Sequence, residues 1–99
     1  RSPALPNVPT AAELGTQGLE AYTWNALFLP KNAPAAIVKR LNDAAVQAMK
    51  TPSVRVRLGG LGAQIVSDDR ATPEYLARFV KTETEKWAAP IKAAGAIVD

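Results

Sequence analysis

The feature that most constrains the fold of this 99-residue chain is the stretch 21–29, which alternates like a β-strand. Successive side chains of a strand point to opposite faces of a sheet. One face would carry Tyr22, Trp24, Ala26 and Phe28, and the other Thr23, Asn25, Leu27 and Leu29. Because both faces become apolar in the second half, we expect burial on both sides there. A two-sided strand needs neighbours, so we expect much of its partner sheet to lie outside these residues.

Two helices are predicted directly after this strand. Pro34 stands at a natural first helical position. Apolar side chains then recur at helical spacing, namely Ile37, Val38, Leu41, Ala44, Ala45, Ala48 and Met49. Thr51 and Pro52 end this helix and begin a second one, because threonine is a favoured N-cap and proline fits a first turn. Glycines within 59–62 end the second helix, and a short strand is predicted at 63–66.

A third helix is predicted to begin at Thr72-Pro73-Glu74. Pro90 lies inside its apolar pattern and is expected to kink or break the helix near Trp87. Residues 97–98 are expected to form a last strand or an extended tail. The sum is an α/β pattern in which helices dominate.

The composition excludes several kinds of chemistry. The chain has no histidine and no cysteine, which removes Ser-His-Asp and Cys-His nucleophile systems and thiolate metal sites. Its 12 basic and 9 acidic residues are scattered, whereas a nucleic-acid interface gathers its basic residues on one face. No apolar run approaches the length of a membrane span. We therefore expect no enzyme, no cofactor, no metal site and no nucleic-acid partner.

Acidic pairs do not change this expectation. Glu83 and Glu85 lie two apart on a predicted helix, so they point to different faces. Asp68 and Asp69 are too few ligands for a hard cation. Two tryptophans could stack on a ligand, but a packing role is the better reading of both.

Asn7 and Thr10 are the candidate ligand contacts. They lie in a loop bracketed by prolines, and Thr10 is expected to cap a short helix over 11–15 together with Glu13, as in a capping box. The free N–H groups at a helix start favour anions, so a carboxylate could be held there. The alternative is that Asn7 makes an Asx-turn and Thr10 is only a cap.

Short motifs recur in a fixed order along the chain. They are the Leu5–Gly15 loop, the Trp24 strand ending at Pro30, the Ala33–Asn42 helix start, the Gly62-Ala63 turn, the Thr72-Pro73-Glu74 start and the close from Lys86-Trp87 to Gly95. This ordered set, which covers essentially all 99 residues, resembles the Bug or TctC family of periplasmic solute-binding proteins. These proteins serve tripartite tricarboxylate transporters.

The resemblance implies a two-lobed receptor of the type II periplasmic-binding kind that closes on a small carboxylate without chemistry. The chain would be its C-terminal fragment. Residues 1–30 would form the end of the second lobe and the crossover strand, and residues 31–99 the helices and short strand that return to the first lobe. Its partners would be the carboxylate, the membrane transporter subunits and the missing upstream lobe, whose loops choose the ligand.

Two positions depart from the family pattern. The family often has aspartate where Asn7 stands, and an amide can donate as well as accept hydrogen bonds. The usual threonine or serine before the helix proline is Ala33, which loses a cap at a cost of about 1 kcal/mol.

The rival hypothesis is a stand-alone helical protein-interaction module. Such a module would have to be monodisperse and fold cooperatively without upstream sequence, and the doubly apolar Trp24 strand argues against it. If the fragment folds alone, we expect it to cover this strand by self-association or by exchange of an element between copies.

Overall fold

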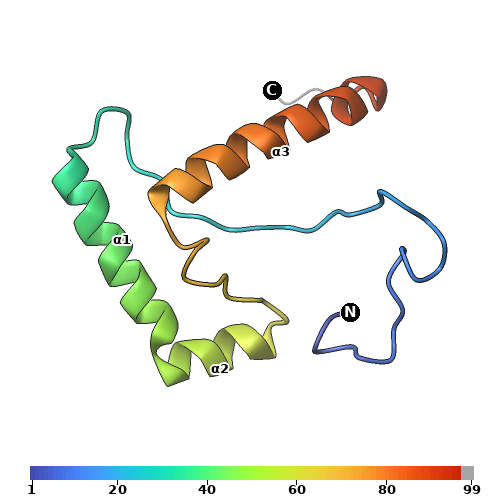
Figure 1. Cartoon of the computed structure of the whole chain (residues 1–99), viewed down its shortest axis with the longest axis horizontal. Coiled ribbons are helices and arrows are strands. Elements are labelled where there is room, and N and C mark those ends of the chain that lie inside the picture. The colour runs from blue at the N-terminus through green and yellow to red at the C-terminus, as the bar shows by residue number, and fades with distance from the viewer. Residues whose placement is uncertain (97–99) are drawn as a thin grey trace.

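The computed structural model describes residues 1–96, in which a long irregular segment precedes three helices and a second irregular segment precedes the last of them (Figure 1). Helix α1 spans Ala35–Lys50, α2 spans Pro52–Gly60 and α3 spans Pro73–Ala93. Helices α1 and α2 meet at a corner, and α1 also contacts α3. The prediction of a helix-rich chain is confirmed, but residues 1–96 contain no strand, so the β part of the α/β prediction is wrong for them.

The boundary between α1 and α2 lies at Thr51, as predicted. Thr51 occupies the N-cap position of α2, and Pro52 follows as the first helical residue. The hydroxyl of Thr51 donates to the carbonyl oxygen of Gln47 at 3.3 Å instead of capping α2. Helix α1 begins one residue later than predicted, because Pro34 is its N-cap, and it has no side-chain cap.

Helix α2 ends at a glycine turn. Gly62 has a φ of 75°, a left-handed conformation that side chains disfavour. The Ala63 N–H reaches back to the Leu58 carbonyl oxygen at 3.0 Å, which satisfies one of the last open acceptors of the helix. The residues after this turn, 63–66, form no strand, which corrects the prediction of a short one.

Helix α3 begins as predicted and continues past its internal proline. The Tyr75 N–H donates to the Thr72 hydroxyl oxygen at 3.1 Å, and Glu74 lies in the first turn. A kink or a break was predicted near Trp87, but the helix runs unbroken through Pro90 to Ala93, so the break is wrong. Pro90 lies in the last turn of α3. Its missing N–H removes only one hydrogen bond there, and only three helical residues follow it.

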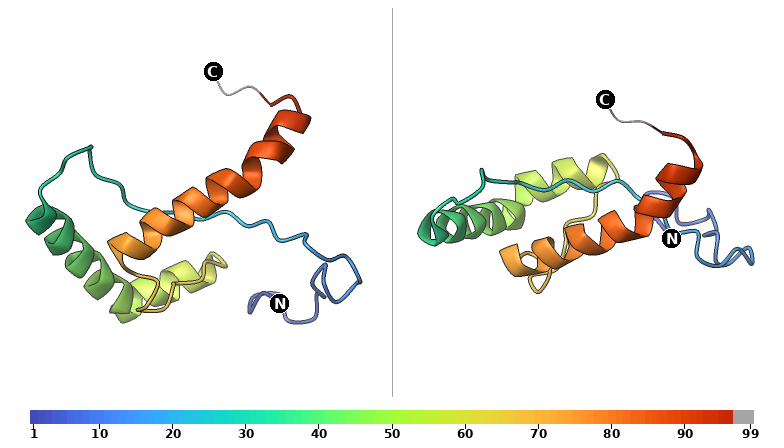
Figure 2. Two further views of the ribbon diagram at one scale, coloured as in Figure 1. Left: turned by 45° about the horizontal axis from the view of Figure 1, so that its top comes forward. Right: turned by 90° about the horizontal axis from the view of Figure 1, so that it is seen from above.

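The predicted strand 21–29 is an extended segment instead. It crosses the middle of the molecule and passes along α3 before it reaches α1 (Figures 1 and 2). A strand exists only when its backbone pairs with another, and residues 1–96 offer it no neighbouring strand. The expected last strand at 97–98 lies outside the described residues.

The three helices enclose only a partial core. No side chain within residues 1–96 is buried, and those that are half-buried include Val46, Val54, Leu58, Leu76 and Phe79. The accessible surface is 8609 Å², whereas a folded monomer of this mass exposes about 5,400 Å². The radius of gyration is 16.7 Å, compared with about 13 Å for a compact chain of this length. Much apolar surface is therefore left open.

Candidate functional site

Thr10 lies at the head of a closed turn, which we call the capped turn (residues 10–16). The Glu13 N–H donates to the Thr10 hydroxyl oxygen at 3.2 Å, and the Thr10 N–H donates to the Glu13 carboxylate at 2.8 Å. These reciprocal bonds confirm the predicted capping box. The Thr16 N–H closes the turn on the Ala11 carbonyl oxygen at 2.9 Å. The predicted short helix 11–15 is wrong, because these residues form hydrogen-bonded turns only.

Arg1 adds a charge to this turn. Its guanidinium lies 3.0 Å from Glu13 through Nε and 2.9 Å through Nη2, and Nη1 donates to the Pro6 carbonyl oxygen at 3.1 Å. The hydrogen bond from Arg1, followed by that from the Thr10 backbone, lowers the pKa of Glu13 from 4.5 to about 2. Glu13 therefore stays ionised over a wide acidic range, and Arg1 links both ends of the N-terminal loop.

The anion position at the head of the capped turn is thus taken by the carboxylate of Glu13. An external carboxylate at this turn would have to share or displace it. Asn7 lies exposed in the same loop, directly after Pro6. Its side-chain amide offers two N–H donors and one carbonyl acceptor. Of the two candidate ligand contacts, Asn7 is therefore the one whose side chain offers these groups to solvent, whereas the Thr10 hydroxyl is bonded to Glu13.

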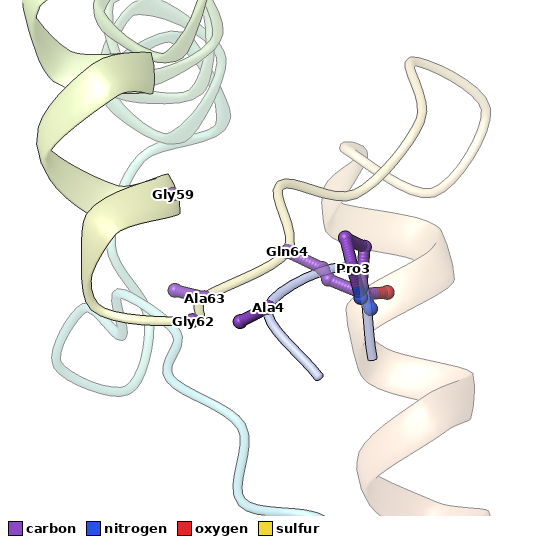
Figure 3. A pocket seen from close by; sticks show the side chains of 6 residues that line it. All are labelled: Pro3, Ala4, Gly59, Gly62, Ala63 and Gln64. Carbon is purple, nitrogen blue, oxygen red and sulfur yellow. The ribbon is translucent and has the colours of Figure 1, made fainter. Parts of the chain in front are cut away.

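The N-terminal loop also meets the glycine turn after α2. A depression of about 170 Å³ lies between them, lined by Pro3, Ala4, Gly59, Gly62, Ala63 and Gln64 (Figure 3). Small side chains leave backbone atoms accessible there, and Gln64 supplies the polar side chain. This contact could not be predicted, because the two segments lie far apart in the chain and neither carries a sequence pattern that specifies the other.

A second and larger hollow of about 620 Å³ lies between α1 and the start of α3. Its lining is Ala33, Ala35, Val38, Lys39, Asn42, Asp43, Thr72, Pro73 and Glu74. Lys39 and Asp43 pair across one turn of α1 at 2.6 Å. Two of the charged side chains that line this hollow are therefore paired with each other.

The remaining candidates lie apart from these hollows. Glu83 accepts a hydrogen bond from the Trp87 indole at 3.1 Å, and Asp68 pairs with Lys50 at 2.8 Å. The hydroxyl of Ser67 lowers the pKa of Asp69. Within residues 1–96, no three metal-ligating side chains gather at one place.

None of the helices in the described part of the chain combines the length and the apolar character that crossing a membrane requires.

Comparison with known proteins gives the chain its family. The model of the tripartite tricarboxylate transporter family receptor (TctC) matches residues 1–96. The chain is 41% identical over 95 residues to the UPF0065 protein in the TAR-I ttuE-ttuC' intergenic region of Agrobacterium vitis, covering 96% of this chain and 28% of the relative. It is 33% identical over 96 residues to protein BugT of Bordetella pertussis, covering 97% of this chain and 28% of BugT.

A third relative is the UPF0065 protein in the tcbD-tcbE intergenic region of Pseudomonas sp. strain P51. The identity is 42% over 88 residues, covering 88% of this chain and 25% of that protein. The chain thus spans about a quarter of the length of these three relatives. No solved structure matches it. Because the family model covers nearly the whole chain, the chain belongs to the tripartite tricarboxylate transporter receptor family, TctC, as its ordered motifs indicate.

Proposed function

We propose that this chain is the C-terminal part of a periplasmic solute-binding receptor that delivers small carboxylates to a tripartite tricarboxylate transporter. The observation that carries the proposal is the receptor-family match over residues 1–96. The absence of histidine and cysteine from the sequence supports binding without chemistry. Its partners are the carboxylate and the membrane subunits of the transporter.

The receptor has two lobes that close on the ligand. Residues 1–30 form the end of the second lobe and the crossover between lobes, and residues 31–99 return to the first lobe. The extended segment before α1 supports this division, because it connects the N-terminal loop to the helices across the molecule (Figure 1). Binding would then shift an equilibrium between open and closed arrangements.

Asn7 and Thr10 contact the ligand in this proposal. Asn7 is exposed, and its amide can donate a hydrogen bond to a carboxylate, which an ionised aspartate cannot do. Thr10 holds the loop in shape through the capping box with Glu13. The specificity among carboxylates comes from loops outside these residues.

The test is calorimetric titration of the intact receptor, the protein encoded by the whole reading frame that contains this chain, with a panel of dicarboxylates and tricarboxylates. We expect saturable heat from at least one of them. The variant Asn7→Asp should weaken that binding about tenfold or more, because it removes a donor and adds a like charge. Asn32→Asp makes the same chemical change in an exposed turn and should leave the affinity within about twofold. No heat from any carboxylate with folded protein would contradict the proposal.

The alternative is a stand-alone helical protein-interaction module. It is favoured by the contacts that α1 makes with α2 and α3, which need nothing outside residues 1–96. Light scattering on the 99-residue chain separates the two. A receptor fragment should self-associate to cover its open apolar surface, whereas a module that works alone should be a clean monomer.

A further inference from the structure

Asn7 occupies the third position of a tight turn over Leu5–Val8, which we call the asparagine turn. The Val8 N–H closes this turn on the Leu5 carbonyl oxygen at 3.1 Å, and Pro6 fills its second position. Proline at that position suits turns of type I and of type II, which differ by a flip of the peptide that joins the second and third residues. A type II turn requires a positive φ at the third residue, and Asn7 has none. The asparagine turn is therefore of type I.

The type II orientation is within reach of this turn. Asparagine tolerates a positive φ better than most other side chains, and Asn32 of this chain adopts one, at 66°. The flip would keep the hydrogen bond between Val8 and Leu5, so that bond does not by itself select the orientation. A contact from outside the turn can therefore decide which way the peptide between Pro6 and Asn7 points.

Arg1 provides such a contact. Its Nη1 donates to the Pro6 carbonyl oxygen at 3.1 Å, and this carbonyl belongs to the peptide that the flip would turn. The carbonyl and the N–H of a trans peptide point in opposite directions, and no cis peptide bond occurs within residues 1–96. The Asn7 N–H therefore points away from Arg1. In the described part of the chain it donates to no backbone carbonyl, so it is open to an acceptor from outside.

Glu13 keeps Arg1 in place. The Arg1 Nε lies 3.0 Å from both carboxylate oxygens of Glu13, and Nη2 lies 2.9 Å from Oε1. The carboxylate is itself held by the Thr10 N–H at 2.8 Å. A planar guanidinium bonded along two of its edges has one orientation, which a lysine ammonium would not have. Since Glu13 neutralises its charge, Arg1 acts through the peptide rather than as a counterion of the ligand.

We propose that Arg1 is a positioning residue: it keeps the peptide before Asn7 in the type I orientation, so that the Asn7 N–H is offered to a ligand carboxylate beside the side-chain amide. The ligand's part in this rests on the proposed function, whereas the control of the turn does not. Without Arg1 the peptide would populate both orientations, and the share of molecules that present this N–H would fall. The apparent affinity for the carboxylate falls with that share.

The turn is tested without ligand by NMR of the intact receptor, labelled at proline and asparagine. The nuclear Overhauser effect (NOE) between the Pro6 Hα and the Asn7 N–H is strong in a type II turn and weak in a type I turn, because the flip brings these protons together. We expect a weak NOE in the unmodified receptor and one at least about twofold stronger in Arg1→Met, which keeps the length of the side chain without its donors. Arg55→Met, at an exposed arginine of α2, should leave the NOE unchanged. A strong NOE in the unmodified receptor, or no increase in Arg1→Met, would overturn the proposal.

A second variant separates control of the turn from a general loss of order in the loop. Alanine disfavours the positive φ that type II requires, so Asn7→Ala should keep the NOE weak even when it is combined with Arg1→Met. A strong NOE in this double variant would overturn the proposal. Should Arg1→Met fail to fold, Arg1→Lys, which keeps the charge but not the planar fork, should raise the NOE in its place. No increase there would equally count against the proposal.

The consequence for binding is measured by calorimetry of the intact receptor, with succinate and citrate as the probes. Arg1→Met should weaken binding by about twofold or more, and it should change binding less in the Asn7→Ala background, where the turn resists the flip. An equal loss in both backgrounds would overturn the proposal, because Arg1 would then act by its charge. No heat from either probe with the unmodified receptor would contradict the proposed function, whereas the NOE comparison would still decide the control of the turn.

Discussion

The capped turn and the extended residues 20–29, which we call the docking segment, are neighbours in the chain and differ in how they are completed. The capped turn closes its own donors and acceptors within seven residues, through Thr10, Glu13 and Thr16. The docking segment has a stronger apolar pattern, yet within residues 1–96 it makes no hydrogen bond to another backbone group, and its aromatic contact is that of Trp24 with Phe79. A local motif satisfies its hydrogen bonds with a few residues that are close in the chain. A strand needs a second strand to bond to, and that strand can lie far away in the sequence.

The largest expected effect is on the docking segment. In the intact receptor, Trp24→Ala should lower the free energy of unfolding by about 3 kcal/mol or more, because the indole packs against Phe79 of α3 and we expect the rest of the receptor to cover its other side. Thr10→Ala, which removes the cap of the capped turn, should cost about 1 kcal/mol. Urea denaturation of both variants measures the difference.

A smaller loss from Trp24→Ala than from Thr10→Ala would reverse this comparison. It would mean that the docking segment stays open in the receptor. The variant Trp24→Phe keeps an aromatic ring against Phe79 and should recover part of the loss.

An intermediate effect is expected at the two Thr-Pro helix starts. Thr72 accepts the Tyr75 N–H, so Thr72→Ala should lower the free energy of unfolding of the intact receptor by about 1 kcal/mol. Thr51 makes no capping bond to α2, so Thr51→Ala should change it by less than about 0.5 kcal/mol. Urea denaturation measures both losses. Equal losses at the two positions would contradict the prediction that the hydrogen bond from the Tyr75 N–H makes Thr72 the more stabilising cap.

The smallest effect concerns the pH dependence of the capped turn. The pKa of Glu13 is lowered to about 2, so its stabilising bonds are present above the ordinary value of 4.5 and are lost as the pH falls through about 2. Carboxyl ¹³C NMR of the 99-residue chain should show Glu13 titrating near that low value. Arg1→Gln should raise the pKa of Glu13 toward its ordinary value, and Arg55→Gln should leave it unchanged. A normal pKa in the unmodified chain would contradict the Arg1–Glu13 contact.

Much of the helical structure could be predicted from the sequence, because its signals are local. Thr51-Pro52 and Thr72-Pro73 mark the starts of α2 and α3 at the positions observed. The capping box at Thr10 was predictable for the same reason. The break at Pro90 was not observed, because one missing bond in a last turn does not outweigh the bonds around it.

The strands and the contacts between distant segments could not be predicted to the same extent. The alternation in residues 21–29 indicates a strand but not its partners, and residues 1–96 contain none. The contact of Lys86 with Glu20 and that of Arg1 with Glu13 depend on how separate segments meet. Asn7 and Thr10 were chosen from local loop chemistry, and their contact with a ligand stays a prediction until binding is measured.

Calorimetry of the 99-residue chain, with light scattering on the same sample, tests most directly whether residues 1–99 complete a core of their own. We predict no cooperative unfolding transition from monomeric chain, because its helices share only half-buried contacts and its docking segment has no backbone partner within residues 1–96. A monomer that unfolds in one transition, with the enthalpy of about 70 kcal/mol typical of a globular domain of this length, would contradict the central claim. It would favour the stand-alone helical module instead.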